Sequence, residues 1–138
     1  MAFAFRLQKV LDYRQLLEEE AKQKYLDCKA ARLKQEAVLA HVRAERSRSF
    51  EQRVSDVNGY LEIHAQAAKF GDDEVLAKLA LDVLCNEEDA AEEAWHARRR
   101  DLETLEKLRE QAKEEWDLEQ SRREQAELDE WVVMRRSK

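Results

Sequence analysis

Hydrophobic residues in the first third of the chain recur at alternating spacings of four and three residues. Nine of the twelve positions in this series are apolar, as the seam of a coiled coil requires. The positions are Phe3, Leu7, Val10, Arg14, Leu17, Ala21, Lys24, Cys28, Ala31, Gln35, Val38 and Val42. The pattern predicts one long helix that buries this seam against a second helix.

A second series with the same spacing runs from Ala77 to Val133, and charged residues interrupt it more often. Its apolar positions become rare after Trp116, where the aliphatic stems of long charged side chains must cover the seam. We therefore expect the far half of the second helix to pack more loosely. Part of its seam is then available to a partner protein.

Helix breakers are almost absent from the chain. Its 138 residues include no proline and two glycines, Gly59 and Gly71, where average usage gives about seven and ten. The chain therefore has one region, near its middle, in which to reverse direction. We predict an all-α fold: a long two-helix antiparallel coiled-coil hairpin in a single elongated domain. The arms are expected at about residues 4–56 and 74–134, with an irregular or short-helix tip at about 57–73.

Two turn signals compete within this tip. Asn58-Gly59 is a strong breaker dipeptide, whereas Gly71 followed by two aspartates resembles a helix end and the cap of the next helix. A hairpin balanced about the midpoint of the chain pairs residue i with about residue 142 − i. This register predicts that Leu11 lies near Trp131 and Tyr25 near Trp116.

Residues 75–85 are apolar on more than one helical face, which a two-helix seam cannot cover completely. One interpretation is a small three-helix cluster, in which Tyr60, Leu61 and Ile63 fold over this segment. The other is an exposed apolar patch that docks another protein. Aromatic anchors for such a patch are available at Phe50, Tyr60 and Phe70.

Charged residues make up 41% of the chain, and the net charge is −6. An acidic surface argues against nucleic acid as a partner, because phosphate binding needs a basic one. The sequence has no apolar run long enough for a membrane span and no pattern typical of a secretory signal, so we expect a cytoplasmic protein without direct membrane insertion. Cys28 and Cys85 would lie tens of ångströms apart in the predicted register, at about 1.5 Å per residue, and are not expected to form a disulfide.

Candidate chemistry is sparse. The three histidines, His41, His64 and His96, are scattered, and the pairing of Glu92 with His96 on one helix face is a weak metal signal. The chain has no glycine-rich phosphate loop, and a two-helix hairpin has no concave pocket that excludes water. We therefore expect no enzyme activity, no metal and no cofactor.

Arginines gather in two places, which the predicted register brings together as a basic band. They are Arg43, Arg46, Arg48 and Arg53 in the first arm, and Arg98, Arg99 and Arg100 in the second. Acidic residues nearby favour a self-compensated, solvated surface. A binding band is the alternative.

Both ends of the sequence resemble FliJ, the small coiled-coil protein of the bacterial flagellar type III export apparatus. The first similar segment is Phe5–Arg14, followed by Glu18-Glu19-Glu20. The second comprises Leu105–Glu110 and Arg122–Trp131. Their order, their placement at the two ends and the length of the chain carry the resemblance, which covers about half of it.

The resemblance implies an antiparallel coiled coil, similar to the central stalk of rotary ATPases. Such a protein inserts into the hexameric export ATPase ring, stimulates it, contacts the cytoplasmic domain of the export gate and is regarded as an escort for export chaperones. By analogy, the end with both termini enters the ring, and the tip contacts a second partner such as the gate. We predict ring contacts at Phe5, Leu7, Leu11, Leu128, Trp131 and Val132, and tip contacts at Phe50, Tyr60 and Phe70.

Two other functions remain open at this stage. One is the equivalent stalk of a virulence type III secretion system. The other is a coiled-coil scaffold or chaperone escort that dimerises through its tip, with residues 75–85 as the contact.

Overall fold

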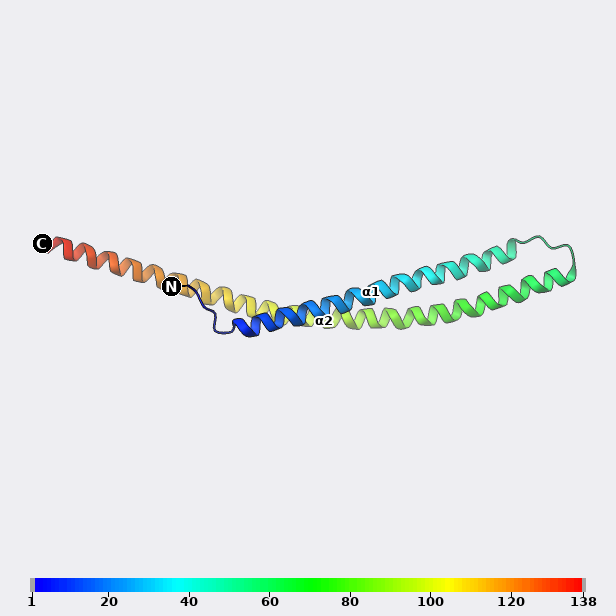
Figure 1. The fold of residues 1–138 in the computed structure, drawn as a ribbon, viewed down its shortest axis with the longest axis horizontal. Coiled ribbons are helices and arrows are strands. Elements are labelled where there is room, and N and C mark those ends of the chain that lie inside the picture. Colours follow the sequence, from blue (N-terminus) through cyan, green and yellow to red (C-terminus); the bar gives the residue numbers. More distant parts are fainter. Residues whose placement is uncertain (1, 138) are drawn as a thin grey trace. The chain divides into compact units, whose positions relative to one another are not determined.

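The computed structural model describes residues 2–137 and contains two helices (Figure 1). Helix α1 spans Gln8–Glu51 and helix α2 spans Val57–Arg136. The helices pack against each other in antiparallel directions, and no strand occurs among the described residues. The predicted all-α hairpin is therefore confirmed.

The chain reverses direction at residues 52–56, so the predicted tip at 57–73 is wrong, as is the second arm's predicted start at residue 74. Asp56 provides the start signal that the sequence analysis missed. Its Oδ1 accepts a hydrogen bond from the backbone N–H of Gly59 at 2.8 Å, as the side chain of an N-cap residue does. Both glycines lie within α2, because a glycine inside a long helix costs only about 1 kcal/mol.

Gly59 has a packing role instead of a turning role. A Cβ atom at this position would lie 2.8 Å from Cγ1 of Val54 and 2.9 Å from Oδ1 of Asp56, closer than real Cβ atoms come. The connection can therefore fold back tightly over the first turn of α2 only because residue 59 has no side chain.

The position of the turn changes the register of the whole hairpin. Tyr25 stacks on Trp95 with ring centroids 5.4 Å apart, and Phe3 contacts Trp116 at 5.9 Å. Residue i therefore faces about residue 120 − i, and the register of 142 − i is wrong. Large aromatic side chains meet across the helices in either register. Matching side-chain sizes therefore could not distinguish the two registers.

Contacts divide the chain into two compact units, each built from parts of both helices. The first unit comprises residues up to Glu19 together with those from His96 onward. Its core consists of Leu11, Leu102 and Leu105, which are at most 9% exposed, and Leu7 packs against them. Leu11 is thus buried against residues 102–105, and its predicted neighbour Trp131 is 56% exposed.

The second unit, Glu20–Trp95, has a seam of mostly small residues. Its buried apolar positions are Leu39 on α1 and Ala67, Ala77 and Ala91 on α2. Cys28 and Cys85 are free and half-buried in this unit. In the observed register they are offset by about seven residues, or about 10 Å along the helices, so the expected separation of tens of ångströms is wrong.

A charged pair lies within the seam of the second unit. Glu88 is 9% exposed and accepts a hydrogen bond from Nε of Arg32, whose Nη1 also contacts Glu36 at 2.7 Å. These hydrogen bonds, first that to Glu88 and then that to Glu36, raise the pKa of Arg32. The buried carboxylate of Glu88 is therefore paired. Removal of this carboxylate would leave Arg32 without its partner across the seam.

The predicted three-helix cluster over residues 75–85 does not form. Residues 57–136 make one continuous helix, so Tyr60, Leu61 and Ile63 cannot fold back over the segment that follows them. Val75, Leu76, Leu79 and Val83 are each more than half exposed. The exposed-patch interpretation of this segment agrees with the structure.

Removal of the Trp95 side chain should test the register directly. Because Trp95 is half-buried and stacks on Tyr25, Trp95→Ala should lower the free energy of unfolding by about 2 kcal/mol. Trp131→Ala, at an exposed position, should cost less than about 0.5 kcal/mol. Urea unfolding followed by circular dichroism would measure both, and equal costs would contradict the register.

The Arg32–Glu88 pair should matter more for specificity than for stability. Glu88→Ala should lower the urea midpoint, because Arg32 then remains in the seam without its main partner. The double variant Arg32→Met/Glu88→Leu should recover the midpoint or exceed it, because both charges are gone. Arg123→Met, which breaks an exposed pair with Glu119, is the control and should change little. A double variant less stable than Glu88→Ala would show that the pair itself stabilises the fold.

Candidate protein-binding surfaces

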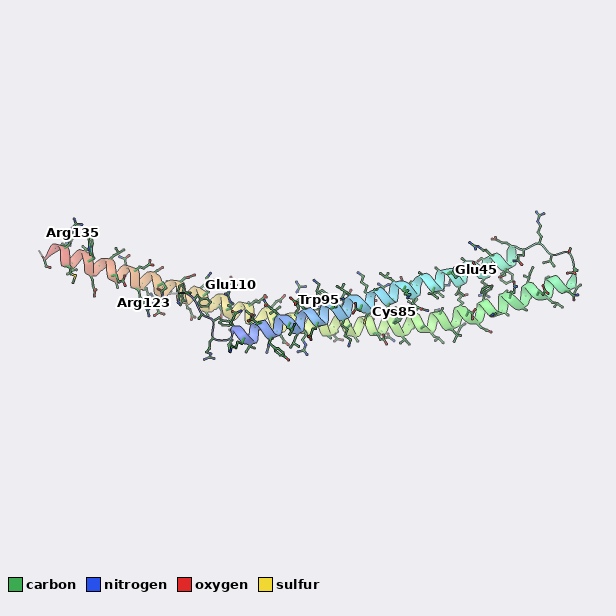
Figure 2. All side chains as sticks on the ribbon, viewed as in Figure 1. Glu45, Cys85, Trp95, Glu110, Arg123 and Arg135 are labelled. Atoms are coloured by element: carbon green, nitrogen blue, oxygen red, sulfur yellow. The ribbon has the colours of Figure 1, made fainter. Side chains whose placement is uncertain are left out.

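Among the described residues of its own unit, the last part of α2 has no helix packed beside it. Every residue from Ser121 to Ser137 is exposed, whereas Phe3, near the start of the chain, reaches only as far as Trp116. Figure 1 shows this part of α2 continuing past the N-terminal segment of the same unit, and Figure 2 labels Arg123 and Arg135 on it. The predicted loosening of the seam after Trp116 agrees with this observation.

Apolar side chains lie on one face of this exposed segment. Leu128, Trp131 and Val132 are separated by three and four residues and are 58%, 56% and 40% exposed. The guanidinium of Arg135 lies over the Trp131 ring, 4.9 Å from its centroid. We call Leu128, Trp131 and Val132 the C-terminal face.

The other three residues predicted for the ring-binding end do not join this face. Leu11 is buried and Leu7 packs against the same leucine core, while Phe5 is half-buried. The beginning of the first arm, residues 3–11, therefore lies beside residues 102–116, because the turn at 52–56 shifts it away from residues 128–132. Leu7 and Leu11 stabilise the fold. Of the six predicted ring contacts, the three residues of the C-terminal face are the exposed ones.

The predicted tip residues separate into two places. Phe50 and Tyr60, which are 54% and 57% exposed, both contact His64, with ring centroids 6.2 Å and 4.3 Å from its ring. Phe70 is half-buried and lines a different groove, together with Glu45 and Lys69. His64 is the member of this aromatic cluster that the sequence analysis missed, because a single histidine in a helix has no distinctive spacing.

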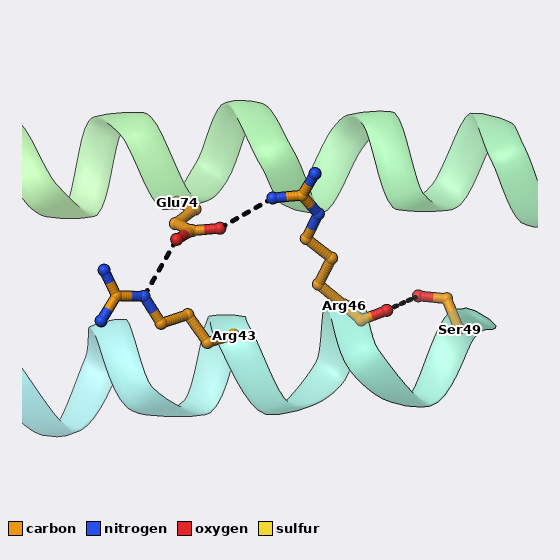
Figure 3. Close-up of polar contacts among 4 residues, drawn as sticks. All are labelled: Arg43, Arg46, Ser49 and Glu74. Atoms are coloured by element: carbon orange, nitrogen blue, oxygen red, sulfur yellow. Dashed lines mark hydrogen bonds and ion pairs between the residues drawn. The ribbon is translucent and has the colours of Figure 1, made fainter. Parts of the chain in front are cut away.

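The arginines near the turn are paired across the helices. Nε of Arg43 and Nη1 of Arg46 donate hydrogen bonds to the two carboxylate oxygens of Glu74 at 2.9 Å and 3.0 Å (Figure 3). The backbone carbonyl of Arg46 accepts a hydrogen bond from the hydroxyl of Ser49, which is 3% exposed. Arg48 pairs with Glu45.

The single basic band predicted from the sequence does not form. Residues 98–100 belong to the first unit, and in the observed register it is Glu74 that lies beside Arg43 and Arg46. The second unit therefore neutralises the charge of these two arginines with a carboxylate of its own. This agrees with the predicted self-compensated, solvated surface.

The two arginines also change the acidity of Glu74. Hydrogen bonds from Arg43 and then from Arg46 hold the pKa of Glu74 below its ordinary value of 4.5. The ionised carboxylate is therefore favoured in the folded state, and this contribution to stability is present above about pH 4.5. It is lost as the pH falls through the lower pKa of the folded protein.

The described residues offer no metal-binding cluster. Within residues 2–137 no three His, Cys, Asp or Glu side chains come together in a way that could hold a metal ion. No helix in that range combines the length and the apolar character needed to cross a membrane. The exposed surfaces of the two helices are therefore the candidate sites.

Comparison with protein families gives one match, to the family described as flagellar FliJ protein, over residues 3–138. No curated protein matches the chain, and no solved structure matches it. The match spans nearly the whole sequence, including the middle, which the resemblance at the two ends did not cover.

The contribution of Glu74 should appear as a pH dependence of stability. Glu74→Gln should lower the thermal unfolding midpoint at pH 7, where the wild-type carboxylate holds two arginines. The difference from wild type should shrink below about pH 4.5, because the wild-type protein loses the same interaction on protonation. Glu62→Gln, at an exposed position on the same helix, should show no such trend. A difference that stayed constant from pH 7 to pH 3 would contradict the assigned role.

Proposed function

The chain belongs to the FliJ family and is thus a component of flagellar protein export, and we propose that it acts there as a non-enzymatic stalk. In this proposal the protein binds and stimulates the hexameric export ATPase and connects it to the cytoplasmic domain of the export gate. It works in the cytoplasm, at the periphery of the membrane-bound export apparatus, and export chaperones are further candidate partners.

The observation that carries the proposal is the unpaired end of α2. Residues 121–137 form about 25 Å of helix without a partner helix in their own unit. A helix this rich in charge gains little from its own sequence beyond local ion pairs, such as that between Glu119 and Arg123. Its apolar C-terminal face is better explained by contact with another protein than by the stability of the hairpin.

The aromatic cluster at the turn supports the second contact. Phe50, His64 and Tyr60 bring together side chains from both helices, and the two largest are more than half exposed. Exposed aromatic side chains held in a fixed arrangement are typical anchors of protein interfaces. We assign this cluster to the gate and the C-terminal face to the ATPase.

A stalk of this kind does its work through binding. The family match favours a flagellar system over a virulence secretion system and over an unrelated scaffold. A gene for an export ATPase next to the gene for this chain would support the same choice.

Substitution of the C-terminal face should weaken the interaction with the ATPase. We expect Leu128→Ser/Trp131→Ser/Val132→Ser to bind the purified export ATPase of the same organism at least tenfold more weakly, which corresponds to about 1.4 kcal/mol. Stimulation of ATP hydrolysis should fall in parallel. The hairpin should remain helical by circular dichroism, because these side chains contribute nothing to the seam.

The matched control is Leu118→Ser/Val133→Ser. These residues are 54% and 65% exposed and lie outside the C-terminal face: Val133 is about 140° around α2 from Leu128, and Leu118 is about 15 Å before Leu128 along the helix. Their substitution should therefore leave binding unchanged. The opposite outcome, in which Phe50→Ala/Tyr60→Ala abolishes stimulation while the C-terminal variant retains it, would show that the turn is the end that engages the ATPase. If none of the variants affected a verified interaction, the stalk proposal would fail.

A further inference from the structure

A second apolar stripe runs along α2 on the side away from α1. It comprises Val57, Leu61, Val75, Leu76, Leu79 and Val83, which are between 56% and 72% exposed. We call these six residues the outer stripe.

The outer stripe is placed by helical geometry. Leu61 and Leu79 are 18 residues apart, which is five turns, so they point in the same direction. Ala77, which is buried against α1, lies two residues from Leu79 and hence about 200° around the helix. The outer stripe is therefore nearly opposite the seam, and packing within the second unit cannot cover it.

The apolar character of this stripe has no role in the hairpin itself. Six large aliphatic side chains, each more than half exposed, extend over about 40 Å of helix. Monomeric proteins seldom expose a continuous apolar patch of this length, and such patches mark interaction sites. A surface this narrow and straight is suited to another helix.

We propose that the outer stripe pairs two copies of this chain through antiparallel α2 helices. With residue i opposite about residue 155 − i of the second copy, Leu76 meets Leu79 and Ala65 meets Ala90. Val83 then lies opposite Asp72, the one charged residue within the stripe, and Val57 and Leu61 lie beyond the end of the partner's stripe. This pairing is independent of the proposed contact with the ATPase.

The flanking charges select a second copy in this orientation. Lys69 and Glu87 are exposed and, because they are 18 residues apart, lie on the same side of the stripe. In the antiparallel register Lys69 of each copy lies opposite Glu87 of the other, so the twofold axis produces two complementary pairs. Parallel pairing in register would place Asp72 against Asp72, and it would put Lys69 and Glu87 on opposite flanks of the contact from their copies, where they could not pair.

The size of the contact predicts a reversible dimer. The helices pair over about residues 65–90 of each copy, about 40 Å, which buries on the order of 1,000 Å² in total, at the lower end for specific protein pairs. Dimerisation should therefore depend on concentration in the micromolar range, where monomer and dimer can both be observed.

The first test is sedimentation velocity on the full-length protein over about 5–500 µM. The sedimentation coefficient should rise from that of a monomer to that of a dimer. Leu76→Ser/Leu79→Ser should weaken the dimer at least tenfold without loss of helicity, because both side chains are exposed in the hairpin. Leu118→Ser/Val133→Ser, also at exposed positions of α2, is the matched control and should dimerise as wild type.

The second test reverses the flanking charges. Lys69→Glu and Glu87→Lys should each weaken self-association, because each places like charges opposite one another twice. Mixed in equal amounts, the two variants should form a heterodimer in preference to either homodimer, since both of its charge pairs are then complementary. The double variant Lys69→Glu/Glu87→Lys should recover the wild-type dimer.

Several results would overturn the proposal. They are a monomer at all concentrations, a dimer that survives the substitutions at Leu76 and Leu79, and a dimer lost only in the Leu118/Val133 control. A failure of the double charge variant to recover, or of the mixed variants to pair, would reject the antiparallel register. None of these results would change the stimulation of the ATPase at concentrations where the chain is monomeric. The dimer proposal can therefore fail while the stalk proposal holds, and the reverse is also true.

Discussion

The connection at residues 52–56 determines what the rest of the molecule can do. It joins a helix of 44 residues to one of 80 residues, so α1 runs out long before α2 does. The N-terminal segment extends the pairing only as far as the contact of Phe3 with Trp116. The remaining part of α2 is exposed on all sides for this reason. Its exposure follows from the lengths of the two helices and not from any single residue within it. Capping by Asp56 and the close approach at Gly59 hold the turn at this position.

The seam combines small apolar residues with a few buried polar groups. Alanines at positions 67, 77 and 91 let the helices approach but contribute little apolar area, so they specify the register weakly. Stacking of Tyr25 on Trp95 and the pairing of Arg32 with Glu88 are more selective, because a shift along the helices would separate each pair. The bidentate contact of Glu74 with two arginines acts in the same way near the turn. Polar and aromatic contacts therefore define an alignment that the alanines alone would leave loose.

Much of the fold could be predicted from the sequence, because heptad spacing and the lack of proline are properties of long segments. The helical hairpin, the thinning of the seam after Trp116 and the excess of apolar residues at 75–85 all follow from such patterns. The position of the turn could not be predicted in this way, since it depends on one capping carboxylate at Asp56 and on a helix that tolerates two glycines. With the turn misplaced, every facing pair shifted by more than twenty residues. Of the predicted ring contacts, Leu11 lies in the leucine core and Leu7 packs against it. Leu128, Trp131 and Val132 are exposed in the structure, and their assignment as contacts for a partner stays a prediction.

The helix α2 therefore presents three distinct surfaces, and only the seam is required for the hairpin. On the seam side of the second unit its buried apolar residues are alanines, because α1 must approach. On the outer stripe and on the C-terminal face its residues are large and apolar, although nothing in their own units packs against them. Polar residues at these positions would preserve both the helix and the seam, so stability of the hairpin does not account for leucine, valine and tryptophan there.

The two surfaces also differ in their surroundings: the outer stripe is flanked by a lysine and a glutamate five turns apart, whereas the C-terminal face carries an arginine over its tryptophan ring. The first arrangement is complementary to itself in the antiparallel direction, which is the physical reason to assign the outer stripe to a second copy of the chain. The assignment of the C-terminal face to a different protein follows from the family match and from the lack of a partner helix beside it.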